Sequence, residues 1–513
     1  MDFTKTYLGI ELGSTRIKAV LCDEEAKVLA QGSFNWQNSF ENGHWTYPER
    51  LFTEGTAACY ASLVDDIKEK FDEIPTTFGA IGISAMMHGY VALDQDYRLL
   101  TPFRTWRDTT TGEAAAALTE LFSENIPLRW SVSHLYQSIL NGESHLKQLR
   151  HITTLSGYMH YLLTGENVLG VGDAAGMFPL AEGNYDEKLT KKIDEKIASH
   201  GYEFKITNLL PAILFAGQSA GKLTEEGARL LDRSGKLQSG IPFCPPEGDA
   251  ATGMVAVNAV TMGEGSVSAG TSAFAMLVTP NKPQEINRDV DIVATPDGKN
   301  VAMIHVNNCC GEIDAWVDLF CEFLALSGQN VDKGKAYELL YTNTLHASKD
   351  CGGITAYNFI SAEPILQVGA PCPSVLRKEA NMSLADFFKA QLYSTVSALA
   401  IGVDDFKEKE HVELKNLKAS GGIFKVPNIA QQIYADALDC PIILTDTAGE
   451  GGAWGMAVLA LYLANAQQPF DAWLSQKIFA KADAVSLAPT KEGRENFMAF
   501  MENYKENLKK FRC

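Results

Sequence analysis

Residues 7–22 read YLGIELGSTRIKAVLC, and the predicted fold depends on this segment. An apolar run, Tyr7 to Leu12, stops at the turn Gly13-Ser14-Thr15, and a second β-like run extends from Ile17 to Cys22. Two short apolar runs on either side of a tight polar turn are typical of a β-hairpin. We therefore predict a hairpin over this segment.

A similar pattern recurs about half the chain length later. Ser266 to Ala269 leads into Gly270-Thr271-Ser272, and Ala273 to Val278 is again apolar. A repeat at half-length predicts duplicated domains, each with its own hairpin. The alternative is that two short segments resemble each other by chance.

Helix-like and strand-like stretches alternate in both halves, which favours an α/β architecture. No low-complexity linker separates the halves, so we expect the domains to be in close contact, with a ligand cleft between them. The predicted helices cover Glu49–Lys70, Ala385–Ala400, Ile429–Leu438 and Glu492–Phe511, and the predicted strands cover Phe78–Ser84 and Pro441–Leu444.

Composition excludes several classes of protein. A chain of 513 residues is too long for one ordinary core, so at least two domains are expected. Its 63 acidic against 44 basic residues give a net charge of −19, which argues against a general binder of nucleic acids or anionic membranes. The uncharged stretch Gly451–Phe470 contains Gly, Gln and Asn, and predicts a buried helix rather than a membrane span.

Cysteine usage points to the cytoplasm. The ten cysteines include no C-x-x-C pair, so neither a disulfide framework nor a zinc site is indicated. The first residues lack the basic and apolar segments of a signal peptide. We expect a cytoplasmic protein whose oligomeric state is open, with a homodimer as one arrangement.

Both Gly-hydroxyl turns are candidate phosphate sites. Gly13, Ser14 and Thr15 offer amides and hydroxyls that grip phosphate oxygens without net positive charge, and Gly270, Thr271 and Ser272 offer the same groups. Two facing turns could clamp one polyphosphate, and Lys18 could add a cation. The alternatives are ordinary hairpin turns and a solvated lysine.

Asp249 is the candidate general base. The segment Pro245–Gly253 surrounds it with Pro, Gly and Ala, which leave little side-chain bulk and let a substrate approach one acid. The alternative, weighted equally, is an Asp that caps a helix over Ala250–Val257.

Two further segments carry candidate substrate contacts. Met87 and His88 end a predicted strand, where α/β proteins place such contacts, although a buried structural histidine is the more frequent explanation. Trp106 and Asp108 lie in one short polar segment that could hold a sugar by stacking and hydrogen bonds, or be an exposed loop. Gly421 and Gly422 permit close approach of a flat ligand such as adenine, or form a strand-to-helix turn.

Taken in order, these pieces resemble the FGGY carbohydrate kinases of the actin, hexokinase and Hsp70 ATPase superfamily. The resemblance runs over nearly the whole chain, and the Met-His-Gly element is most similar to that of xylulokinases and their close relatives. The matching segments are Gly9–Lys18, Met87–Gly89, Trp106–Thr109, Leu163–Glu166, Gly172–Gly176, Gly248–Ala251, Ser268–Ser272 and Ser420–Gly422.

The resemblance implies two ribonuclease-H-like domains, the duplicated actin-like ATPase fold, around a central cleft. On this basis residues 1–248 would form a sugar-binding domain, residues 249–490 a nucleotide-binding domain, and residues 491–513 a C-terminal helix. ATP and Mg²⁺ are the implied cosubstrate and cofactor.

The resemblance also implies roles for the candidate residues. Asp249 would be the general base, and Glu11 a carboxylate associated with the hydrated metal, where the family usually has Asp. Met87, His88, Trp106 and Asp108 would contact the sugar. The implied nucleotide-binding residues are Gly13, Ser14, Thr15, Lys18, Gly270, Thr271, Ser272, Gly421 and Gly422.

The resulting hypothesis is ATP-dependent phosphorylation of a small ketose, D-xylulose foremost, at its terminal hydroxyl. L-Ribulose, gluconate or a polyol are the alternative substrates. A different class of protein is a sensor that binds sugar or nucleotide without turnover. Asp249 favours the enzyme, whereas Glu11 in place of the usual Asp leaves the sensor as an alternative. A chaperone-like ATPase is disfavoured because no substrate-binding β domain follows the second half.

Overall fold

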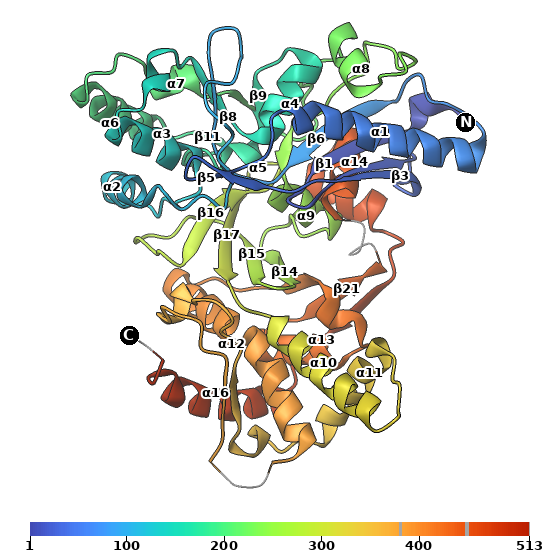
Figure 1. Ribbon diagram of the computed structural model, residues 1–513, viewed down its shortest axis with the longest axis vertical. Coiled ribbons are helices and arrows are strands. Elements are labelled where there is room, and N and C mark those ends of the chain that lie inside the picture. Colours follow the sequence, from blue (N-terminus) through green and yellow to red (C-terminus); the bar gives the residue numbers. More distant parts are fainter. Residues whose placement is uncertain (379–381, 447–450, 512–513) are drawn as a thin grey trace.

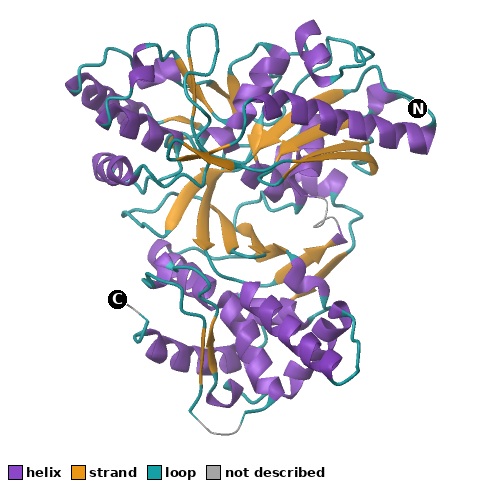
Figure 2. Ribbon diagram, in the orientation of Figure 1, coloured by secondary structure: helices purple, strands orange, loops and turns teal. Residues whose placement is uncertain are grey.

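The structure is a computed structural model that describes residues 1–378, 382–446 and 451–511. Two β-sheets lie near the centre of the molecule, and helices surround them in an upper and a lower half (Figures 1 and 2). The predicted α/β class is confirmed.

The first sheet is built around the predicted hairpin. β1 pairs antiparallel with β2 from Tyr7↔Cys22 to Leu12↔Ile17, as the sequence predicted, and parallel with β6 on its other side. The strand order is β13-β6-β1-β2-β3. The strand bounds are β1 Tyr7–Leu12, β2 Arg16–Cys22, β3 Val28–Asn35, β6 Ala80–Ala85 and β13 Glu247–Gly248.

The second sheet repeats this arrangement. β14 pairs antiparallel with β15 and parallel with β20, so the inner order β17-β15-β14-β20-β21 matches β3-β2-β1-β6-β13 of the first sheet. The duplicated fold predicted from the recurring turn is therefore confirmed. The strand bounds are β14 Glu264–Ala269, β15 Ala273–Thr279, β16 Val290–Ala294, β17 Asn300–Val306, β20 Asn416–Ser420, β21 Ile442–Thr445 and β22 Ala484–Leu487.

The helices agree with the predicted positions, although their ends shift. α12 continues past the predicted Ala400 to Glu410, because the acidic and basic residues of its last turns remain good helix formers in solvent. The longer helices are α1 Arg50–Phe71, α2 Gly112–Phe122, α3 Ser131–Leu140, α4 Leu155–Thr164, α6 Glu187–Ser199, α9 Asp249–Ala256, α10 Gly311–Leu326, α11 Lys333–Asn343, α12 Leu384–Glu410, α13 Ile429–Leu438, α14 Gly451–Leu463 and α16 Lys491–Leu508.

Shorter elements connect these parts. Among the described residues, five two-stranded sheets accompany the two larger sheets. The short helices are α5 Val171–Ala174, α7 Ile206–Leu209, α8 Glu225–Leu231 and α15 Phe470–Trp473; the strand pairs are β4 Ser39–Glu41 with β5 His44–Thr46, β7 Val91–Leu93 with β8 His151–Thr153, β9 Val168–Gly170 with β12 Ala212–Leu214, β10 Leu180–Ala181 with β11 Asn184–Tyr185, and β18 Thr355–Tyr357 with β19 Ser374–Leu376.

A helix from late in the chain packs on the first sheet. α14, red in Figure 1, lies against β1, β2 and β6. A Cβ on Gly9 would lie 2.1 Å from the Ala453 carbonyl oxygen, so only glycine permits this approach of helix to strand. A Cβ on Gly455 would lie 2.1 Å from the Thr252 carbonyl oxygen, which brings α14 equally close to α9.

In the part of the chain that the structure describes, none of the helices is both long enough and apolar enough to cross a membrane. The stretch predicted as a buried helix forms α14 over Gly451–Leu463. α16 occupies residues 491–508 of the predicted C-terminal helix, and residues 512–513 lie outside the described residues. The division of roles at residue 248 stays a prediction.

Candidate active site

Asp249 lies at the start of α9, directly after strand β13. Gly248 is the N-cap residue of α9, so Asp249 does not cap the helix, and its side chain turns to a strand end of the first sheet instead. Its Oδ1 accepts a hydrogen bond of 3.1 Å from the Met87 amide. Burial raises the pKa of this carboxyl above its ordinary value, which would make the ionised form a stronger base.

Glu11 shares this location. It lies on β1 opposite Lys18 on β2, and its Oε2 accepts a hydrogen bond of 3.2 Å from the Ala453 amide in the first turn of α14. Burial, followed by the charge of Asp249, raises the pKa of Glu11 to about 7. The structure thus brings two predicted carboxylates, and the predicted cation Lys18, to one end of the first sheet.

Two further buried carboxylates support the Asp249 loop. Glu247 accepts hydrogen bonds from the amides of Gly172 (3.4 Å) and Asp173 (2.9 Å). Asp173 in turn accepts from the Thr154 hydroxyl at 2.6 Å and from the Ser156 hydroxyl. Burial raises the pKa of Asp173 to about 6. These contacts join β13 to α4 and α5. They hold the segment that precedes Asp249 in place.

His88 is buried next to Asp249 along the strand end. Its backbone has the left-handed φ of 71°, and its Nδ1 lies 3.4 Å from the Gly176 carbonyl oxygen. Burial, followed by the nearby charge of Arg129, lowers the pKa of His88 well below its ordinary value, so the ring is neutral. The amide of Gly89 donates to the Arg129 carbonyl oxygen at 2.9 Å, which holds the two segments together.

A cavity of about 700 Å³ lies elsewhere, and Asp249, Glu11 and His88 are not among its lining residues. Trp106 and Asp108 line it together with Arg129 from the first half, and Asp291 and Asn307 line it from the second. The cavity therefore lies between the two halves, as predicted for the ligand cleft.

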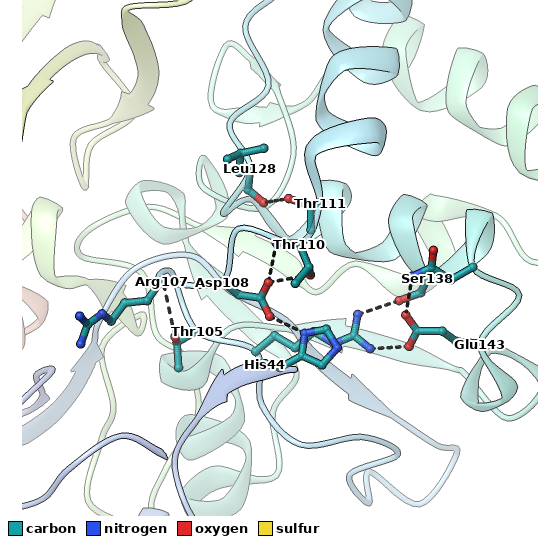
Figure 3. Close-up of polar contacts among 11 residues, drawn as sticks. His44, Thr105, Arg107, Asp108, Thr110, Thr111, Leu128, Ser138 and Glu143 are labelled. Carbon is teal, nitrogen blue, oxygen red and sulfur yellow. Dashed lines mark hydrogen bonds and ion pairs between the residues drawn. The ribbon is translucent and has the colours of Figure 1, made fainter. Parts of the chain in front are cut away.

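Asp108 is held by its own domain. It is 1% exposed, and it accepts hydrogen bonds from the Thr110 amide (2.9 Å), the Thr110 hydroxyl (2.7 Å) and the His44 ring (2.5 Å), as Figure 3 shows. Although burial opposes ionisation, the hydrogen bonds from Thr110 and His44 keep the pKa of Asp108 below its ordinary value. Trp106 is 42% exposed and donates from Nε1 to the Ser14 hydroxyl at 3.1 Å, so this segment contacts the first turn.

The first predicted phosphate turn joins β1 and β2. The Gly13 amide donates to Arg16 within the turn, while its carbonyl oxygen accepts from Trp36 Nε1 at 2.6 Å. The Tyr47 hydroxyl donates to the Ser14 carbonyl oxygen at 2.6 Å. The Gly13 amide is thus used internally, and a phosphate here would rely on the remaining groups of Ser14 and Thr15.

The second predicted turn joins β14 and β15, and it opens on a separate cavity of about 750 Å³. The Gly270 amide donates within the turn to the Ser272 carbonyl oxygen at 2.9 Å. Gly270, Thr271 and Gly422 line the cavity, with Cys310, Asp314 and Tyr337 on its other walls. Gly421 has φ of 126°, and a Cβ there would lie 2.0 Å from the Ala269 carbonyl oxygen.

Several of these residues were not identified from the sequence. Arg129, Asp314 and Tyr337 lie in segments with no motif of their own, and only the folded chain brings them to a cavity. Asp173 was within a matched segment, and its burial was the missing information. Together the arrangement places two carboxylates and a neutral histidine at one end of the first sheet, with one cavity between the two halves and another beside the second sheet.

Two sheets of the same strand order, with cavities between and beside them, define a duplicated actin-like ATPase fold. Solved structures of the same fold include a xylulose kinase from Rhodospirillum rubrum, with a TM-score of 0.78, 16% identity and coverage of 99% of this chain and 100% of that one. A gluconate kinase from Lactobacillus acidophilus has a TM-score of 0.76 at 16% identity, with coverage of 99% of both chains.

Sequence comparison identifies the family. Residues 6–256 match the N-terminal domain, and residues 265–464 the C-terminal domain, of the FGGY family of carbohydrate kinases. This chain belongs to that family and is a carbohydrate kinase. A curated relative, "Xylulose kinase" from Haemophilus influenzae, is 22% identical over 476 residues, covering 89% of this chain and 90% of the relative.

Proposed function

We propose that this kinase transfers the γ-phosphoryl group of ATP to the terminal hydroxyl of a ketopentose, D-xylulose foremost. Asp249 carries the proposal: its carboxylate accepts a hydrogen bond from the Met87 amide, next to His88 and just past the end of β6. The relative from Haemophilus influenzae, similar over most of both chains, favours xylulose among the sugars. L-Ribulose, gluconate and polyols are the competing substrates.

Asp249 accepts the proton of the attacking hydroxyl in this mechanism. The hydroxyl oxygen then forms a bond to the γ-phosphorus as the bond to the ADP oxygen breaks, and ADP leaves with those electrons. The neutral ring of His88, with Met87 and Trp106, orients the sugar so that its hydroxyl is in line. Such a raised-pKa carboxyl contributes about 10²–10⁴-fold to transfer rates as a general base.

The residues at the strand end suit a hydrated Mg²⁺. Within residues 1–378, 382–446 and 451–511, no three His, Cys, Asp or Glu side chains form a metal-binding group. Mg²⁺ usually needs only one or two carboxylates, with water and phosphate oxygens completing its shell, and Glu11 meets that need while Asp249 stays free to act as the base. When bound, the ion would neutralise charge on the transferred phosphoryl group.

The nucleotide is proposed to occupy the cavity of about 750 Å³ beside Gly270 and Gly422. The missing side chain at Gly422, with nothing within 4 Å of a Cβ there, leaves the room that a flat base needs. The turns at Gly13 and Gly270 would then bracket the phosphates.

Release of ADP in the presence of Mg²⁺ and ATP tests the proposal directly, across D-xylulose, L-ribulose, gluconate and polyols. A signal that depends on D-xylulose is the expected result. If ADP release depends on another compound of this panel, that compound is the substrate in place of D-xylulose. If no compound stimulates ADP release while ATP still binds, the result favours the sensor.

His88→Ala is expected to raise the KM for the sugar about tenfold while the KM for ATP changes little, because uniform substrate contacts act on KM. Initial rates with each substrate varied in turn provide the measurement. Equal effects on both constants would assign His88 a structural role.

Glu11→Gln is expected to raise the Mg²⁺ concentration for half-maximal rate about tenfold, since loss of a carboxylate near a metal costs about 10–100-fold in affinity or activity. Glu11→Asp keeps the charge and is the matched control, which should stay within a few-fold of wild type. A Glu11→Gln variant with unchanged Mg²⁺ dependence would remove Glu11 from the metal site.

A further inference from the structure

One strand of the second sheet makes polar contacts with the first half of the molecule. β16 lies at the edge of the second sheet, next to α5, at the junction of the two halves (Figure 1). Asp291 on β16 accepts a hydrogen bond from Asn125 Nδ2 at 2.9 Å through Oδ1, and forms an ion pair with Arg129 through Oδ2. Asn125 also donates to the Val290 carbonyl oxygen at 3.1 Å.

Arg129 connects this contact to the cavity of about 700 Å³, which we call the sugar cavity because the proposed sugar contacts Trp106 and Asp108 line it. Arg129 lines this cavity together with Trp106 and Asp108, and its charge acts on the buried ring of His88. Its side chain is 25% exposed and that of Asp291 is 13% exposed, so the pair is largely shielded from solvent. Shielded ion pairs with further hydrogen bonds hold one geometry, whereas exposed pairs are weak and mobile.

We propose that Asp291 is a positioning residue for the sugar: from the second half of the molecule, it holds the Arg129 guanidinium at the wall of the sugar cavity. The inference rests on the proposed function. Without Asp291, the long Arg129 side chain gains rotamers, and part of the sugar's binding energy is spent on ordering it again. The sugar site is therefore completed by a residue of the second half. Recognition of the sugar then depends on Asp291, which lies far along the sequence from the sugar-binding motifs.

Asp291→Asn is the first test, because it keeps size and the contact with Asn125 but removes the charge that pairs with Arg129. We expect the KM for the preferred sugar to rise about tenfold, with the KM for ATP and kcat within about two-fold of wild type. Asp291→Glu restores the charge and should recover part of the sugar affinity.

A double-mutant cycle with Arg129→Gln tests whether Asp291 acts through Arg129. If it does, the double variant is no worse than Arg129→Gln alone, because the second change removes an interaction already lost. Independent multiplication of the two effects would overturn the inference.

Glu124→Gln is the matched control at the same junction. Glu124 pairs with Lys282 of the second half at 2.9–3.0 Å, but it does not line the sugar cavity. Its variant should keep the wild-type KM for sugar, and a rise equal to that of Asp291→Asn would indicate a general weakening of the junction and refute the positioning role. If wild type phosphorylates no sugar, the proposed function fails; if wild type is active and Asp291→Asn binds sugar normally, only this inference fails.

Discussion

Asp249→Asn is expected to lower sugar phosphorylation by at least about 10²-fold while ATP still binds, since it removes the general base and leaves the cleft in place. The amide keeps an oxygen that can accept from the Met87 amide, so the loop geometry is retained. Sugar-dependent ADP release measures the loss, and calorimetric titration with ATP measures the retained binding.

Stability separates this effect from misfolding. Burial raises the pKa of Asp249, so the folded state disfavours its charge, and this unfavourable contribution is present at pH values above the ordinary pKa. A neutral amide avoids that cost, and the Tm of Asp249→Asn at neutral pH should equal or exceed that of wild type. A lowered Tm would contradict this account.

Asp96→Asn is a control for carboxylate loss as such. Asp96 is exposed, with a loose contact of 3.6 Å to Arg98, and its variant should keep full turnover. Turnover of Asp249→Asn equal to that of this control would refute the assignment of the base.

Local patterns predicted the elements that depend on nearby residues. The hairpin over residues 7–22 has the expected bounds except that its second strand begins one residue earlier, at Arg16, and the second Gly-hydroxyl turn marks a second sheet of the same strand order. In both cases, two short apolar runs and a polar turn between them are sufficient, because the partner strand is a few residues away.

The contacts that complete the site come from distant parts of the chain. Glu11 meets the Ala453 amide only because Gly9 lets α14 approach β1, and Asp108 meets His44 only after both segments fold. Neither local propensity nor motif spacing predicts such contacts, because they depend on how whole helices and strands pack together. Geometry likewise removes one of the two alternatives for Asp249: Gly248 takes the cap position, and the role of Asp249 as general base stays a proposal.

Gly421→Ala is expected to weaken ATP binding by more than tenfold, which corresponds to about 1.4 kcal/mol or more. The backbone at Gly421 has φ of 126°, which side-chain-bearing residues rarely adopt, and its Cβ would lie 2.0 Å from the Ala269 carbonyl oxygen. Ala269 ends β14 immediately before the Gly270 turn, and it lines the same cavity. Relief of the clash must therefore move the Gly270 turn or the Gly421–Gly422 segment, which changes the wall of the proposed nucleotide cavity.

Two other glycines make this prediction specific. Gly369→Ala adds a Cβ in open space, away from the cavity, and should leave both ATP affinity and Tm unchanged. Gly422→Ala also meets no protein atom within 4 Å, so it should fold normally, and any loss of ATP affinity in it measures contact of the new methyl group with the nucleotide. The KM for ATP and calorimetric binding, with Tm for each variant, provide the readout. Wild-type ATP affinity in both Gly421→Ala and Gly422→Ala would place the nucleotide elsewhere, because the first distorts the cavity wall and the second fills it.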